Sequence, residues 1–162
     1  DDVIGHARIA KEIAPTKVAS GEHAANRIMF KQLLQADAIS VMQIDATRVA
    51  GVNENLANVL MAFKFGIPVC PHAGGIGLCE MVQHIAMFDA IAVSGHHAKR
   101  VVEYVHHLHE HFVEPARVIN GCYRAPSIPG SGAHMRDTSI DQYLFPTGRY
   151  WSLALETSGA RI

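Results

Sequence analysis

Short apolar runs and helical periodicities alternate along the first ninety residues of the chain. Three short runs of mostly apolar residues are typical of strands buried on both faces, and they cover 17–22, 38–45 and 67–72. Between and after them, apolar residues recur every three or four positions, which predicts helices at 24–35, 52–65 and 77–88. A helical pattern also opens the chain and should stop at Pro15, because proline cannot continue a helix. This alternation of strands and helices predicts a parallel sheet covered by helices.

The spacing of the predicted strands favours a closed barrel. The strands end near 22, 45 and 72, and a fourth is expected at 90–94 or at 100–104. A (β/α)8 barrel allots roughly 30 residues to each strand–helix unit, which is close to this spacing. A doubly wound α/β sheet would give similar spacing and remains the alternative. In both folds the carboxyl ends of the strands meet at one edge, where active sites lie.

The regular alternation of apolar runs and helical patterns ends after residue 113. Prolines and glycines interrupt the pattern there, and apolar clusters at 118–119 and 143–145 suggest short strands in an irregular segment. We therefore expect a partial barrel domain at 1–113 and a C-terminal segment at 114–162 that packs on the barrel or on another domain.

Composition and charge narrow the class of protein. Lys and Arg number 14 against 15 Asp and Glu, so the basic excess of a nucleic-acid-binding protein is missing. No stretch approaches the ~20 apolar residues of a membrane span, so no membrane partner is expected. The three cysteines form no CxxC pair, and their odd number favours a reducing compartment. We expect a cytoplasmic protein whose partner is a small molecule.

Three successive predicted strands end in side chains that can carry chemistry. They are Glu22, Asp45 and His72, and the parallel arrangement brings all three to the same edge of the sheet. An Asp beside a His can orient the ring for general acid–base catalysis, and a Glu oxygen suits a hard cation such as Mg²⁺. Any one of these carboxylates could instead cap a helix or anchor a loop. One carboxylate is also too few for a metal site.

The residues around these strand ends resemble the enolase superfamily, mandelate racemase subgroup, and within it the L-fuconate dehydratases. The most specific stretches are Ala14–Arg27 and Pro71–Glu80. The resemblance implies that Glu22 ends the fifth barrel strand as the third Mg²⁺ ligand. It implies that Asp45 and His72 end the sixth and seventh strands as a hydrogen-bonded dyad. It further implies that Glu103, in the region of the eighth strand, faces the substrate.

The same resemblance implies a lyase that dehydrates a sugar acid through an enediolate intermediate, with Mg²⁺ as cofactor. The Lys-x-Lys motif that supplies the base, the first two metal carboxylates and an N-terminal capping domain have no counterpart in this sequence. We therefore expect a fragment, about strands five to eight with the C-terminal covering segment, that is inactive alone and belongs to a homo-oligomer. The alternatives are a catalytically inactive remnant that retains the fold for association, and a racemase or epimerase that uses the same residues.

Two further patterns carry weaker signals. A histidine-rich stretch follows residue 105, and on a helix His107 and His111 would be one turn apart and could chelate zinc. A solvated histidine-rich helix is the favoured interpretation, because no cysteine or extra carboxylate has zinc-like spacing. The glycines of 74–77 could cradle a phosphate at a helix N-terminus, but they lack the spacing of a dinucleotide or Walker loop.

Overall fold

The computed structural model describes residues 2–96, 98 and 100–158, and the chain divides into two compact units. The first unit is Asp1–His106 and the second is His107–Ile162. Each unit is described by itself below. The domain boundary predicted at 113/114 remains a prediction, since compactness within each unit does not define a domain.

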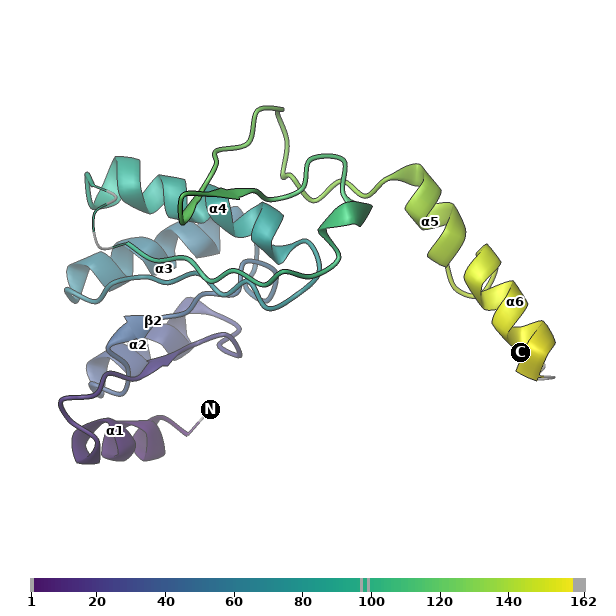
Figure 1. Cartoon of the computed structure of the whole chain (residues 1–162). Helices are drawn as coiled ribbons and strands as arrows, with labels where there is room; N and C mark the ends of the chain where they lie inside the picture. The colour runs from purple at the N-terminus through teal and green to yellow at the C-terminus, as the bar shows by residue number, and fades with distance from the viewer. Residues whose placement is uncertain (1, 97, 99, 159–162) are drawn as a thin grey trace. The chain divides into compact units, whose positions relative to one another are not determined.

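Four α-helices of the first unit confirm the helical periodicity. They are α1 (Val3–Glu12), α2 (Arg27–Gln35), α3 (Val52–Lys64) and α4 (Leu78–Phe88), labelled in Figure 1. Helix α1 ends ahead of Pro15, as predicted. The Asn26 side chain caps α2 by accepting hydrogen bonds from the backbone N–H groups of Ile28 and Met29. Gly66 follows the end of α3 with φ +71°, the left-handed conformation that favours glycine after a helix.

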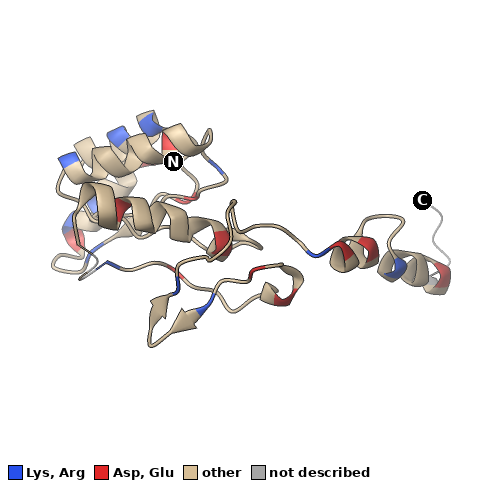
Figure 2. Cartoon of the chain, turned by 90° about the horizontal axis from the view of Figure 1, so that it is seen from above, with Lys and Arg blue, Asp and Glu red and all other residues tan. Residues whose placement is uncertain are grey.

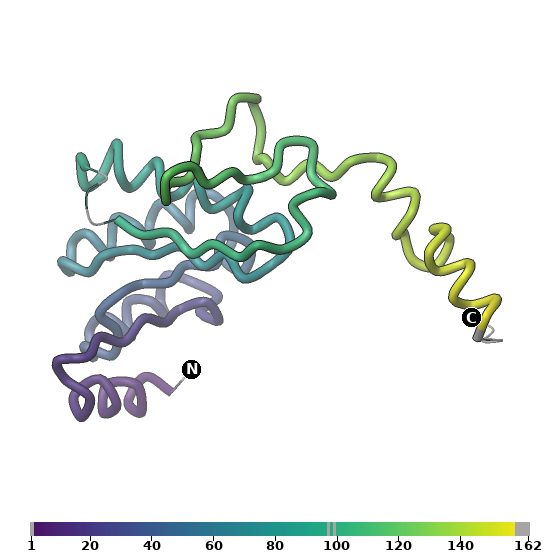
Figure 3. Tube along the Cα trace, viewed as in Figure 1, coloured from purple at the N-terminus to yellow at the C-terminus, as the bar shows by residue number. Residues whose placement is uncertain are grey.

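The strands are shorter than the apolar runs that predicted them, but their pairing is parallel. Strand β1 (Ala19–Ser20) pairs with β2 (Val41–Met42), with Ala19 opposite Val41. Isolated parallel bridges continue the order to the third run, from Met42 to Val69 and from Asp45 to His72. These segments therefore pair in chain order, with the helices placed between them along the chain (Figure 3). This arrangement brings the polar strand ends into one row.

Two predictions about residues 90–111 are wrong. The predicted strand at 90–94 is instead the π-helix η1 (Asp89–Val93), which continues α4 and closes with a 2.7 Å hydrogen bond from Ser94 N–H to the Asp89 carbonyl. The histidine-rich helix is reduced to one 3-10 turn, η2 (His109–His111). The segment at 100–104 is assigned no strand, although the Glu103 N–H lies 3.3 Å from the Pro71 carbonyl. His97 and Lys99 lie outside the described residues.

The core of the first unit lies between the strands and the inner faces of α2 and α3. Phe30, Met42, Ile44 and Val59 are all 0% exposed within it. Burying side chains of this size contributes about 1.5–3 kcal/mol each relative to leaving them in water. Because this packing fixes β2 and the turn after β1, it also fixes the strand ends that bear the candidate site.

In the part of the second unit that the structure describes, the 3-10 turn η2 is followed by a hairpin and two α-helices. Strand β3 (Val118–Ile119) pairs antiparallel with β4 (Cys122–Tyr123), which confirms the strand predicted at 118–119. The strand predicted at 143–145 is wrong, since Tyr143 ends helix α5 (Asp137–Tyr143), and α6 (Arg149–Ser158) follows. The Trp151 indole N–H donates to the Tyr143 carbonyl at 2.9 Å and thereby joins the two helices.

A carboxylate closes the loop that contains this hairpin. The Glu114 carboxylate accepts hydrogen bonds from the hydroxyl and backbone N–H of Ser127 and from the backbone N–H of Ile128. These bonds, the Ser127 hydroxyl first, lower the pKa of Glu114 below its ordinary value, because they stabilise the charged form.

Charge and hydropathy of the described residues are unexceptional. Basic and acidic residues are interspersed along the chain (Figure 2). Among the helices that the structure describes, none combines the length and the apolar character needed to cross a bilayer.

Candidate functional site at the carboxyl ends of the strands

Glu22 follows β1 through a turn that requires glycine. Gly21 has φ +132°, and a Cβ at this position would lie 2.6 Å from the Phe30 ring and 2.9 Å from the Gln43 carbonyl. The chain therefore passes close to the core just before Glu22 and then turns outward. The Glu22 side chain is 42% exposed, and its carboxylate lies 3.5 Å from Nε2 of His23 and 3.4 Å from Nδ1 of His72.

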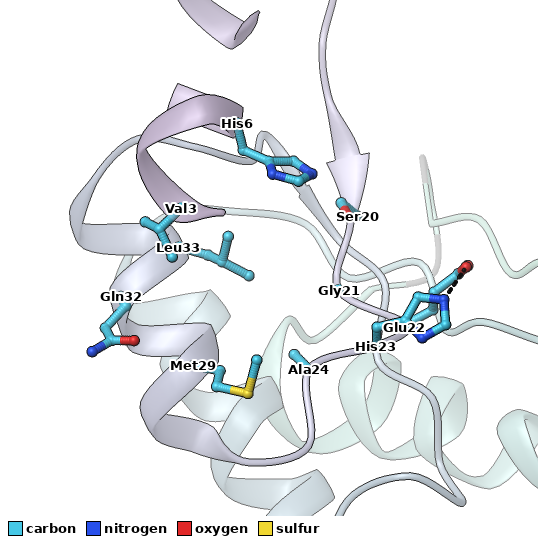
Figure 4. Close-up of a pocket in the computed structure, with 10 residues that line it drawn as sticks. All are labelled: Val3, His6, Ser20, Gly21, Glu22, His23, Ala24, Met29, Gln32 and Leu33. Carbon is cyan, nitrogen blue, oxygen red and sulfur yellow. Dashed lines mark ion pairs between the residues drawn. The ribbon is translucent and has the colours of Figure 1, made fainter. Parts of the chain in front are cut away.

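A cavity of about 170 Å³ lies beside this turn. Glu22 and His23 form its rim on the side of β1, and α1 and α2 contribute His6, Gln32 and Leu33 (Figure 4). The dashed line in Figure 4 is the Glu22–His23 ion pair. The carboxylate thus points away from the core and is available to solvent.

His72 meets two carboxylates at its Nδ1 nitrogen. Nδ1 lies 2.6 Å from Oε2 of Glu103 and 3.4 Å from Oε2 of Glu22. This nitrogen is shielded from solvent, and its contacts are electrostatic without the angle of a good hydrogen bond. The ring also lies against Gly74, where a Cβ would approach its Cε1 to 2.5 Å and its Nε2 to 2.9 Å. Gly74 is therefore required for the position of the ring.

Glu103 contacts three consecutive residues around His72. Its backbone N–H lies 3.3 Å from the Pro71 carbonyl, and its Oε2 accepts from the Ala73 N–H at 2.6 Å. The same oxygen makes the short contact to the His72 ring. The structure therefore brings the three predicted residues Glu22, His72 and Glu103 together.

Asp45 lies near His72 in the backbone but turns its carboxylate elsewhere. The two residues are partners in a parallel bridge. The Asp45 Oδ1, however, accepts from the backbone N–H and the hydroxyl of Thr47, each at 2.8 Å, and Oδ2 lies 3.9 Å from Nε of Arg48. The predicted hydrogen bond between Asp45 and His72 is therefore not formed. The reason is local: an Asp followed two residues later by Thr closes its own turn.

Cys70 is a neighbour of the site that the sequence did not indicate. Burial raises the pKa of the Cys70 thiol, and the negative charge of Glu103 raises it further. A thiol in this environment stays protonated near neutral pH and is a poor nucleophile. We assign the Cys70 side chain to packing within the third apolar run, 67–72.

The metal-binding side chains of the described residues do not complete a magnesium site. Glu22 fits as one oxygen ligand, because its carboxylate is exposed at a strand end. Mg²⁺ requires near-octahedral oxygen coordination, and within the described residues no group of three His, Cys, Asp or Glu side chains could hold a metal ion. The histidine-rich stretch gives no zinc site among those residues either; His111 Nδ1 lies 3.0 Å from the Ser139 hydroxyl.

Comparison with known protein families shows which family the chain belongs to. The model of the enolase C-terminal domain-like family matches residues 1–139. The chain belongs to this family. Its described strand–helix units are therefore a mixed α/β part of the C-terminal domain of an enolase-superfamily protein.

Individual members of the enolase superfamily resemble the chain over most of its length. The crystal structure of human mitochondrial enolase superfamily member 1 has a TM-score of 0.92 and 50% identity, and covers 96% of this chain and 36% of that one. L-galactonate dehydratase of Hypocrea jecorina is 46% identical over 148 residues, 90% of this chain and 32% of that protein. L-talarate dehydratase from Polaromonas sp. JS666, complexed with Mg and L-glucarate, has a TM-score of 0.68 and 25% identity, over 85% of this chain and 35% of that one. The chain spans about a third of the length of these enolase-superfamily relatives.

Proposed function

We propose that this chain forms the C-terminal part of a sugar-acid dehydratase of the mandelate racemase subgroup, with a substrate similar to L-fuconate. The observation that carries the proposal is the ring of His72, held at a strand end with Glu103 at 2.6 Å and Glu22 at 3.4 Å. The name of the relative L-galactonate dehydratase, 46% identical over 90% of this chain, supports the same chemistry. In this proposal the chain contributes about strands five to eight of a (β/α)8 barrel.

The proposed reaction removes water from two neighbouring carbons of the substrate. A base takes the proton from the α-carbon, hydroxide leaves the β-carbon, and the resulting enol rearranges to a 2-keto acid. His72 donates a proton to the departing hydroxide, so that water leaves. Asp45 and Glu103 are the two carboxylates that could orient His72 for this step. The base is proposed to be a lysine outside this chain.

Magnesium is proposed only for the whole protein. There Glu22 would provide one of several oxygen ligands, and the bound ion would stabilise negative charge on the substrate carboxylate. The bound Mg of the L-talarate dehydratase structure supports this choice of cofactor.

Titration of the 162-residue chain with MgCl₂ should show no binding tighter than about millimolar, because Glu22 alone offers too few ligands. Isothermal calorimetry measures this directly, with the Glu22→Gln variant as the matched control that loses the ligand charge. Micromolar affinity that disappears in Glu22→Gln would show that this chain forms a complete site by itself.

The chain is also proposed to associate with itself. Within the described residues, β1 pairs only with β2, so one edge of β1 has unpaired backbone groups. Helix α1 also exposes apolar side chains, with Ile4 81% and Ile9 53% exposed. Light scattering of the 162-residue chain should give dimers or larger species, because free edges and apolar faces favour association. A monomer that unfolds cooperatively would contradict this expectation.

We propose a cytoplasmic location for the protein, whereas the name of the relative mitochondrial enolase superfamily member 1 indicates mitochondria for that relative. A fluorescent fusion of the full-length protein, imaged with a mitochondrial marker, distinguishes the two.

Product analysis of the full-length protein tests the proposed function. The protein is incubated with Mg²⁺ and a panel of sugar acids that includes L-fuconate and L-galactonate, and the products are identified by mass spectrometry and NMR. Loss of one water with formation of a 2-keto acid supports dehydration. An epimer of unchanged mass would instead establish a racemase. Absence of turnover by a correctly folded protein would favour the inactive remnant.

A further inference from the structure

We infer that Glu54 is a positioning residue for Glu22, because it anchors the start of α2 and thereby holds the loop that carries the proposed metal ligand. Glu54 belongs to the first turn of α3 and acts through the backbone of Arg27. The inference deepens the proposed function, on which it rests, by assigning a residue that supports the magnesium ligand.

The loop that carries Glu22 is short and is fixed at its two ends. It leaves β1 at Gly21, where the turn requires glycine, and it enters α2 at Arg27. Between these ends the Ala24 N–H donates to the Gly21 carbonyl at 2.9 Å, in the turn that Figure 4 shows. The core fixes the end at β1. The position of Glu22 therefore depends on how firmly the end at α2 is held.

Side chains accept hydrogen bonds from the first three backbone N–H groups of α2. The Asn26 side chain accepts from Ile28 and Met29, and the Arg27 N–H donates to Oε1 of Glu54 at 2.6 Å. The other carboxylate oxygen, Oε2, lies 3.3 Å from Nη1 of Arg27. A carboxylate is favoured at this place, because the N-terminus of a helix carries partial positive charge and unpaired N–H groups. The contacts of Asn26 are local, whereas the contact of Glu54 joins α2 to α3.

Glu54 lies on a part of α3 that has its own hydrogen bonds. Its side chain is 12% exposed, although the side chain of Arg27 is 59% exposed. The next residue, Asn55, is buried and donates to the carbonyls of Ala46 and Gly51 at 3.3 Å and 3.0 Å. These bonds tie the first turn of α3 to the loop between β2 and α3. The residue that anchors α2 is therefore itself held in place.

Hydrogen–deuterium exchange of the full-length protein, without metal or substrate, tests the anchor. Glu54→Ala should make the backbone of 21–30 exchange about tenfold faster, because a hydrogen bond to a charged acceptor stabilises local structure by about this factor. Arg27→Ala keeps the backbone N–H and should change the rate less than about twofold, since an exposed ion pair contributes little. Peptides from α4 should exchange as in the wild type. Faster exchange in all peptides would indicate general unfolding and would overturn the inference.

Removal of the donor gives a second arm of the experiment. Arg27→Pro deletes the N–H, and proline is well tolerated at the first position of a helix when an extended residue such as Asn26 precedes it. In this background Glu54→Ala should change the exchange rate less than about twofold, because the two residues form one contact. A further large increase there would overturn the inference, as would wild-type exchange in the single variant Glu54→Ala.

Magnesium affinity connects the anchor to the site. Glu54→Ala should weaken Mg²⁺ binding to the full-length protein about tenfold, the lower end of the range for residues that support a metal ligand. Glu54→Gln keeps an acceptor oxygen and should recover part of the affinity. The matched control is Glu114→Ala, which removes another carboxylate that accepts backbone N–H bonds and should leave the affinity within about twofold of the wild type.

Isothermal calorimetry measures these affinities. Faster exchange in 21–30 with unchanged Mg²⁺ affinity would overturn the role of Glu54 in positioning Glu22. If the wild-type full-length protein binds no Mg²⁺ and dehydrates no sugar acid, the proposed function fails, while the exchange rates still decide whether Glu54 holds the loop.

Discussion

His72→Asn should lower kcat of the full-length protein by about 10²–10⁴, the usual contribution of a general acid–base residue. Asparagine keeps a polar group against Gly74 but carries no proton that it can donate near neutral pH. KM should change far less, because His72 acts on the leaving hydroxide and does not hold the substrate carboxylate. Steady-state kinetics with the best substrate of the panel provides the measurement.

The melting temperature must be measured with the kinetics, since the His72 ring also packs against Gly74 and Glu103. If His72 only supported the turn, activity and melting temperature would fall together. Phe63→Ala, at an exposed position of α3, provides a folded reference for both measurements. An active His72→Asn protein of ordinary stability would remove His72 from the mechanism.

Phe30→Ala should lower the free energy of unfolding by about 3–5 kcal/mol, the range for truncating a buried phenylalanine. Phe30 is 0% exposed, and its ring packs beside Gly21, the residue that leads into Glu22. The variant therefore leaves a cavity under the turn that bears the proposed metal ligand. Urea denaturation followed by circular dichroism gives the change in free energy.

Phe63→Ala makes the same substitution where the ring is 58% exposed, and it should cost well under about 1 kcal/mol. Equal losses in the two variants would show that Phe30 is less well packed than its burial indicates. A large loss in Phe30→Ala alone would confirm that the core under β1 supports the site.

Sequence periodicity predicted the helices of the first unit well, because apolar residues recur at helical spacing, and in α2, α3 and α4 the helix has a buried face. Its failure at 90–94 has a physical cause: Ile91 and Val93 form an apolar run that suits a strand, but the chain is still completing the last turn of a helix. In the tail, the apolar cluster at 143–145 is shared between a helix end and aromatic contacts, including the Phe145 and Trp151 rings. Short apolar runs do not distinguish these cases.

The candidate site was predictable at the level of the backbone but not of the side chains. Strand spacing placed Asp45 beside His72, and the two are bridge partners in the structure. Which carboxylate lies against the His72 ring depends on the other hydrogen-bond donors that each carboxylate can reach. Strand spacing does not predict these donors. Thr47, two residues after Asp45, captures its carboxylate, and this signal is present in the sequence. The approach of Glu103 requires the fold, since 30 residues separate it from Ala73.

The π-helix at the end of α4 has a consequence for tracing the history of this segment. Phe88 and Val93 both pack against the same core. On a straight α-helix, residues five apart point about 140° away from each other, whereas the wider π turn stacks them on one side. One inserted residue in an ancestral α-helix would produce this geometry. Relatives with a straight helix should therefore lack one residue between Phe88 and Arg100, and an alignment without a gap there would misplace Glu103 by one position.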